Sequence, residues 1–156
     1  MTDQQGESTV VDVTQESLDL LIVLTRSYNW VTLHVNKFLR QYGLNPTEFG
    51  VLEVLYHKGG MPLQQIGEKI LISSGNITYV IDKLEKRGLL LRKPCKADRR
   101  VIYAELTEEG HKLIAEIFPL QHQNLEESLQ GLTLEEKRQI IPLLKKLGKS
   151  AQALKK

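Results

Sequence analysis

Residues 72–110 read ISSGNITYVIDKLEKRGLLLRKPCKADRRVIYAELTEEG, and this stretch decides the fold. Four apolar residues in its first half recur at the i, i+3, i+4 and i+7 spacing of a single helix face, which predicts a buried stripe. The stripe comprises Ile77, Val80, Ile81 and Leu84. The helix is predicted over residues 74–87, because Ser73 is a suitable N-cap and Gly88 is a suitable C-terminal stop.

A shorter helix is predicted before this one, and a hairpin after it. Leu63, Ile66 and Ile70 have helical spacing, and so few residues separate them from the next helix that the pair predicts a helix-turn-helix. After Gly88, two runs of apolar, β-branched and aromatic residues flank a basic stretch that contains Pro94. This pattern indicates a strand, a basic turn and a second strand.

Positive charge is concentrated in the same region. Between Asp82 and Arg100 the chain carries eight basic and three acidic residues, a balance of +5, whereas the whole chain is +2, which leaves −3 for the remainder. A basic segment beside a helix whose outer face carries hydroxyl and amide groups predicts contact with DNA. The alternative is a basic turn that contacts only solvent.

The quoted stretch resembles the winged helix-turn-helix of the MarR family of bacterial transcription regulators. The resemblance rests on DKLEKRGLL at the end of the recognition helix, DRR in the wing and LTEEG at the start of the next helix. It extends less closely over residues 18–147. Residues 43–59, GLNPTEFGVLEVLYHKG, are similar to the family's second helix and resemble a subgroup that responds to quinones and related aromatic compounds.

The resemblance implies a mainly α fold with a small β hairpin, in which a winged helix-turn-helix is joined to a helical dimerisation region. The implied function is that of a dimeric, sequence-specific DNA-binding regulator, a repressor that a small aromatic or phenolic ligand or an oxidant releases from a palindromic operator. Two other hypotheses stay open. One is a winged-helix module that binds proteins and no specific DNA, and the other is a nonspecific architectural DNA-binding protein.

The rest of the chain is arranged around this lobe. Residues 1–13 are polar, acidic and without periodicity, and are predicted to form a flexible arm. Residues 14–42 and 107–153 are predicted to form the helical dimerisation region, and residues 43–106 the DNA-binding lobe. The first long helix and the C-terminal helices carry more apolar surface than one small lobe covers. A second copy of the chain would bury it in a two-fold dimer, and an intramolecular helical cap is the alternative.

Capping residues predict where the helix after residue 43 begins. Asn45 is expected as the N-cap, with Pro46 at the first helical position and Glu48 reaching back to the cap. This helix is predicted to end at about residue 58. Residues 61–63 then form an extended piece that is expected to pair with the hairpin.

Capping residues also predict the C-terminal helices. Thr107 is expected to cap a helix that continues to about residue 128 with a kink at Pro119. Thr133 and Glu136 form a capping box for the final helix, in which Pro142 predicts a bend or a break.

Eleven residues are predicted to form the DNA-binding surface. The second helix of the motif is expected in the major groove, with Asn76 as the best candidate for reading a base. By resemblance, Arg100 is expected in the adjacent minor groove, with Asp98 holding it or a neighbouring backbone group. Any one of the eleven could instead be a solvated surface position. They are Ser73, Ser74, Asn76, Thr78, Tyr79 and Lys83 from the helix, Asp98 and Arg100 from the wing, and Lys93, Lys96 and Arg99 as expected phosphate contacts.

A site for an effector is implied by the resemblance, because the family usually binds a small aromatic or phenolic ligand between the helical region and the winged lobe. Five residues with ring side chains in the first two helices are candidates for lining it. Ordinary core positions are the alternative for each of them. The five are Tyr28, Trp30, His34, Phe38 and Tyr56.

Cys95 suggests a rival, redox-sensing mechanism. Arg92, Lys93 and Lys96 surround it with positive charge, which favours a thiolate that oxidants attack. The family's thiol sensors, however, generally place the reactive cysteine in the first helix, where this chain has none. A wing residue without a redox role is the alternative.

Composition limits the remaining possibilities. A length of 156 residues with 41% hydrophobic content suits one domain, and no apolar run approaches a membrane span. The N-terminus lacks an export signal, and a single cysteine fits a reducing cytoplasm. The four histidines are scattered and no phosphate-binding or nucleophile motif occurs, so no metal site, no cofactor and no enzymatic activity are predicted.

Overall fold

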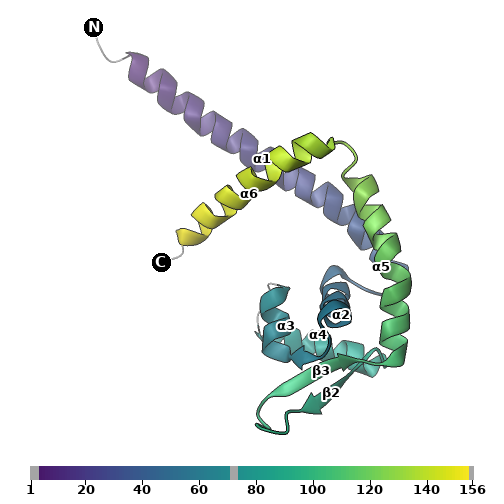
Figure 1. Ribbon diagram of the computed structural model, residues 1–156. Coiled ribbons are helices and arrows are strands. Elements are labelled where there is room, and N and C mark those ends of the chain that lie inside the picture. The colour runs from purple at the N-terminus through teal and green to yellow at the C-terminus, as the bar shows by residue number, and fades with distance from the viewer. Residues whose placement is uncertain (1–3, 71–73, 155–156) are drawn as a thin grey trace.

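The computed structural model describes the backbone of residues 4–70 and 74–154 and the side chains of residues 13–70 and 76–154. Six helices and a three-stranded sheet lie in these ranges (Figure 1). The predicted mainly α fold with a small hairpin is therefore confirmed. In chain order the elements are α1 (Gln4–Arg40), α2 (Pro46–Lys58), β1 (Met61–Pro62), α3 (Leu63–Lys69), α4 (Ser74–Lys86), β2 (Leu90–Pro94), β3 (Ile102–Leu106), α5 (Glu108–Ser128) and α6 (Leu134–Ala153).

The elements from α2 to β3 form a lobe, and three helices extend from it. Figure 1 shows α1 leaving the lobe as one long helix, α5 rising from the hairpin, and α6 folding back from the end of α5. Helix α5 packs on both α1 and α2, so it joins the long helix to the lobe.

A small antiparallel sheet, in the order β1-β3-β2, supports the hairpin. Strand β2 pairs with β3, with Leu90 opposite Leu106, and it ends at the proline that was predicted for the turn. Strand β1 pairs with the other edge of β3, with Met61 opposite Ala104. The predicted hairpin and its extended partner are both confirmed, although Leu63 already begins α3.

The apolar stripe predicted for α4 is buried, since its four side chains are 0 to 7% exposed. Burying each of them contributes about 1.5–3 kcal/mol relative to leaving it in water. The stripe belongs to a core built by all the elements of the lobe together with α5 and the end of α1. Its other members include Leu52 and Leu55 of α2, Ile66 of α3, Leu90 of β2, and Ile114 and Ile117 of α5.

Helices α2 and α5 begin with the predicted caps. Asn45 Oδ1 accepts a hydrogen bond from the Glu48 backbone N–H at 2.9 Å, and Glu48 Oε2 accepts one from the Asn45 N–H at 3.0 Å. Thr107 Oγ1 accepts a hydrogen bond from the Gly110 N–H at 3.1 Å and donates one to the Gly88 carbonyl at 2.6 Å. Thr107 therefore starts α5 and also ties it to the turn that ends α4.

The predicted start of α1 is wrong, and of the bend or break expected at Pro142 the break is excluded. Helix α1 begins at Gln4, so residues 4–13 have helical backbone where a flexible arm was expected. No proline interrupts this segment, and extending an existing helix is far easier than nucleating one. Helix α6 opens with the predicted box at Thr133 and Glu136 but continues through Pro142 without a break. One proline removes one interior hydrogen bond, and the turns on both sides hold the helix together.

Helices α1 and α6 leave many apolar side chains uncovered in the single chain. No residue of α6 is buried, and Leu143 is 64% exposed. None of the helices in the described ranges combines the length and the apolar character needed to cross a bilayer. The uncovered residues include Leu18, Leu20, Leu21, Ile22 and Val23 of α1, and Ile140, Ile141, Leu143, Leu144 and Leu147 of α6.

Candidate nucleic-acid interface

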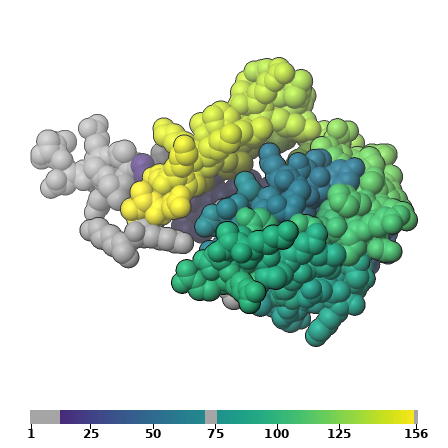
Figure 2. Space-filling model, turned by 60° about the horizontal axis from the view of Figure 1, so that its bottom comes forward, coloured from purple at the N-terminus to yellow at the C-terminus, as the bar shows by residue number. Residues whose placement is uncertain are grey.

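The outward face of α4 is polar because the apolar stripe occupies the opposite face. Asn76, Thr78 and Tyr79 are all exposed on it, Tyr79 to 70%. Ser73 and the side chain of Ser74 lie outside the described residues, so their proposed contacts stay predictions. Figure 2 brings the bottom of the lobe forward, with the green hairpin next to the teal helix.

The wing carries a charged pair that fixes its tip. Asp98 Oδ1 accepts hydrogen bonds from the Arg100 backbone N–H at 3.0 Å and from its Nε at 3.1 Å, and Oδ2 accepts one from Nη2 at 3.0 Å. The bonds to Arg100 hold the pKa of the Asp98 carboxyl below its usual value, and they raise the pKa of Arg100. Asp98 was expected to hold Arg100 or a neighbouring backbone group, and it binds both the backbone N–H and the guanidinium of Arg100.

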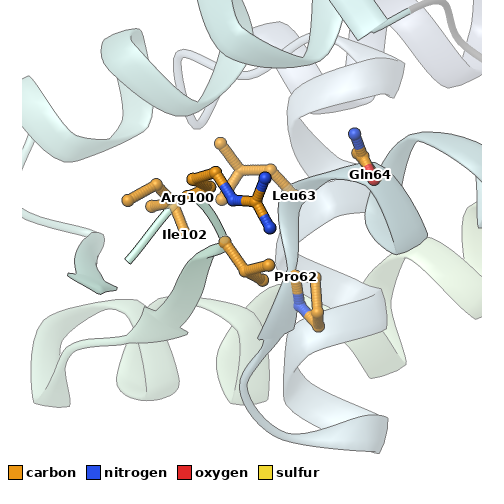
Figure 3. A pocket seen from close by; sticks show the side chains of 6 residues that line it. Pro62, Leu63, Gln64, Arg100 and Ile102 are labelled. Carbon is orange, nitrogen blue, oxygen red and sulfur yellow. The ribbon is translucent and has the colours of Figure 1, made fainter. Parts of the chain in front are cut away.

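The Arg100 side chain also lines a pocket beside the wing. This pocket, of about 190 Å³, lies between the wing and the start of α3 (Figure 3). None of the five residues predicted to bind an effector lines it. Its lining residues are Pro62, Leu63, Gln64, Arg100, Val101 and Ile102.

A second arginine of the hairpin, Arg92, braces β2 against α4. Its guanidinium pairs with both Asp82 and Glu85, and Nη2 also donates to the Thr78 carbonyl at 3.5 Å. Burial by itself would lower the pKa of Arg92, but the bonds to Asp82 and Glu85 outweigh it and raise the pKa. This brace was not predicted from the sequence. The i, i+3 spacing of the two acidic residues on α4 was the signal for it.

The predicted phosphate-binding cations differ in how far they are already paired. Lys83 Nζ lies 2.6 Å from Glu48 Oε1, and Lys93 pairs with Glu105. Lys96 and Arg99 are exposed and make no ion pair with any other described residue. Lys96 and Arg99 are therefore the cations most available to a phosphate, whereas Lys83 already has a carboxylate partner within its own chain.

Comparison with known proteins agrees with this geometry. The MarR family model matches residues 44–102, which lie within the winged lobe. The HTH-type transcriptional regulator MhqR of Bacillus subtilis is 50% identical over 140 residues, which are 90% of this chain and 97% of MhqR. The chain belongs to the MarR family. Its relatives are named as transcription regulators and not as enzymes, so the predicted family and the predicted role in transcription are confirmed.

Solved MarR-type structures share the whole fold. BpsR of Bordetella bronchiseptica, whose DNA binding is regulated by 6-hydroxynicotinic acid, is 27% identical with a TM-score of 0.74, over 83% of this chain and 98% of BpsR. Sco3205 of Streptomyces coelicolor, a MarR family regulator solved in complex with DNA, is 19% identical with a TM-score of 0.82, over 91% of this chain and 89% of Sco3205.

The five residues predicted to bind an effector are not gathered into one pocket within the single MarR-type chain. Tyr28, Trp30 and His34 are exposed on α1. Phe38 packs against Tyr42, with ring centroids 5.4 Å apart. The predicted site therefore has no enclosed form within the residues described for one subunit.

Tyr56 belongs to a row of ring side chains in contact with one another, which was not predicted from the sequence. Its ring centroid is 5.2 Å from that of His57 and 5.9 Å from that of His111. Phe118 of α5 continues the row, 4.8 Å from His57 and 4.6 Å from His122. The i, i+4 spacing of Phe118 and His122 was a local signal, whereas the contacts of Tyr56 with His111 and of His57 with Phe118 join α2 to α5.

Cys95 is half-buried in the wing turn, where its backbone N–H donates to the Val101 carbonyl at 2.9 Å. The positive charge expected around it is reduced, because Arg92 is paired with two carboxylates of α4. In the described ranges, no three side chains of His, Cys, Asp or Glu form a group that could hold a metal ion.

Proposed function

We propose that this regulator binds an inverted-repeat operator as a dimer, with α4 in the major groove and the wing in the minor groove. The exposed polar face of α4, next to a hairpin whose Arg100 is held by Asp98, carries the proposal. The major groove admits an α-helix and presents a distinct pattern of donors and acceptors for each base pair. The likeness to Sco3205, which was solved on DNA, supports this use of the fold.

The described residues take different roles in this proposal. Asn76 reads a base, because its amide can donate and accept together and so match the edge of an adenine. Thr78 and Tyr79 contact the DNA backbone through their hydroxyls, and the exposed cations Lys96 and Arg99 bind phosphates. Ser73 and Ser74 are proposed to contribute at the start of α4, and Lys93 at the wing once it leaves Glu105.

Dimerisation is proposed through the uncovered apolar faces of α1 and α6. In a single chain these faces leave many large apolar side chains exposed, and soluble monomers rarely expose large contiguous apolar patches. A two-fold pair buries them and sets two copies of α4 at a fixed separation, as an inverted repeat with half-sites about one DNA turn apart requires. Action on bacterial DNA would place the dimer in the cytoplasm.

Release by a small aromatic or phenolic effector is proposed on the likeness to BpsR, which answers to an aromatic acid. Phe38 and Tyr56 are the candidates beside the lobe, and Tyr28, Trp30 and His34 lie on the part of α1 that a second subunit would cover. Titrating quinones and salicylate-like compounds into a mixture of protein and operator tests this part. Failure of every such compound to release DNA counts against it.

Selection of bound duplexes from a random pool tests the proposed function as a whole. The expected product is an inverted repeat whose half-sites are about one helical turn apart. A winged-helix module for protein interactions would enrich no sequence. A nonspecific architectural protein would bind well but enrich nothing, because phosphate contacts carry no preference.

A further inference from the structure

Two cations at the C-terminal end of α4 contact the segment that runs from the turn after α1 to the start of α2. Arg87, directly after the last residue of α4, donates from Nη1 to the Gly43 carbonyl at 2.6 Å and from Nη2 to the Tyr42 carbonyl at 3.2 Å. Lys83, one helical turn earlier, lies 2.6 Å from Glu48 at the start of α2. The end of α4 therefore contacts the α1–α2 junction, which is the turn after α1 together with the start of α2, at two points.

The junction is built to receive these cations. The two carbonyls that Arg87 binds follow directly after α1, where the negative end of the helix dipole favours a cation. The planar guanidinium of Arg87 matches two carbonyls at once. Gly43 adopts φ +66°, which a side chain would strain, and a Cβ there would lie 3.5 Å from Arg87 Nη2.

Glu48 requires its partner for a different reason. Its carboxylate is only 1% exposed, and a buried charge is costly unless it is paired and hydrogen-bonded. One oxygen accepts from the Asn45 N–H and the other faces Lys83. Lys83 thus completes a buried site and is not simply a cation that awaits a phosphate.

We propose that Arg87 and Lys83 form a latch that fixes the orientation of α4 relative to α1, and that both are positioning residues for operator recognition. This rests on the proposed reading of DNA by α4. The brace of Arg92 links α4 only to the wing. The latch links the end of α4 to the turn that directly follows α1, through Arg87, and to the start of α2, through Lys83. Helix α1 is the long helix whose exposed face is proposed to join the two subunits. The separation of the two copies of α4 would then be set through the latch.

Arg87→Lys separates positioning from phosphate contact. Lysine keeps the charge but cannot bridge two carbonyls in the same way. Affinity is measured for a duplex that the wild-type protein selects from a random pool and for a scrambled duplex of equal length, each over a salt series. The latch predicts a loss of at least about tenfold on the selected duplex, no change on the scrambled one, and an unchanged salt slope. Lys86→Ala, which removes an adjacent exposed cation, is the matched control for charge and should not reproduce this pattern.

Two results together would identify Arg87 as a phosphate contact and overturn the latch. Arg87→Lys would keep near wild-type affinity, and Arg87→Ala would bind both duplexes equally more weakly with a shallower salt slope. Glu48→Gln supplies a second test that does not depend on Arg87. Glutamine can keep the cap to Asn45 while it removes the charge that holds Lys83. The latch predicts weaker binding of the selected duplex, whereas a rise in affinity for both duplexes would show that the freed Lys83 serves phosphates. Absence of any preference in the wild-type protein would overturn the reading by α4 and the latch together.

Discussion

Arg100→Ala tests the wing most sharply, because its expected effect is electrostatic and its structural cost is small. The Arg100 side chain is 90% exposed and pairs with Asp98 at the tip of the hairpin. The substitution removes one cation from each wing and hence two from a dimer. Each neutralised phosphate contributes about 0.9 to the slope of log K against log salt, so the slope should become shallower by roughly 1.8. When the salt is raised from about 50 to 200 mM, the factor by which affinity falls should then be about 12 times smaller for the variant than for the wild-type protein.

The assay is fluorescence anisotropy of a labelled, selected duplex over a salt series. Lys112→Ala is the matched control, because Lys112 is an exposed cation of α5 that pairs with Glu108 at 2.7 Å, away from the wing. Its slope should equal that of the wild-type protein. A slope that Arg100→Ala leaves unchanged would remove the wing from the interface, and an equal change in both variants would attribute the effect to net charge alone.

Four further changes test other parts of the molecule. The pKa of Asp98 is lowered in the folded chain, so its ion pair with Arg100 is present at neutral pH and is lost only as the pH falls through that lowered value. Asp98→Asn imitates the protonated carboxyl and should weaken operator binding at pH 7. Equal affinity of the variant and the wild-type protein would refute this. Thr107→Ala removes the cap of α5 and should lower the free energy of unfolding in urea by about 1–2 kcal/mol, whereas Thr107→Ser should not. Leu144→Glu should shift the mass measured by sedimentation toward a single subunit, and Lys145→Glu on the same helix should not. Cys95→Ser should leave release by quinones intact, and loss of the response would favour the redox alternative.

Patterns that act within one element could be predicted from the sequence. The stripe of Ile77, Ile81 and Leu84 follows from helical spacing, and its burial needs no knowledge of the partner surface. The caps at Asn45 and Thr107 depend on residues only three positions away. The same locality explains why the hairpin itself was predictable.

Pairs that join distant elements could not be predicted in this way. Arg92 reads as one more cation of a basic run until the hairpin is known to lie against Asp82 of α4. Lys83 reads as a groove contact until Glu48, 35 positions earlier, is found buried beside it. The charge count was right, but which charges face solvent depends on the packing of α2, α4 and β2.

Competition between an operator and bulk DNA for the intact protein tests the central claim most directly. A labelled duplex carrying the selected inverted repeat is displaced by unlabelled copies of itself, by the same half-sites with half a turn inserted between them, and by bulk genomic DNA. Recognition by two copies of α4 at a fixed separation predicts displacement by the intact repeat at far lower concentrations, by a factor of about 10³ or more over bulk DNA. Equal displacement by all three competitors would contradict it, since binding would then depend only on phosphates.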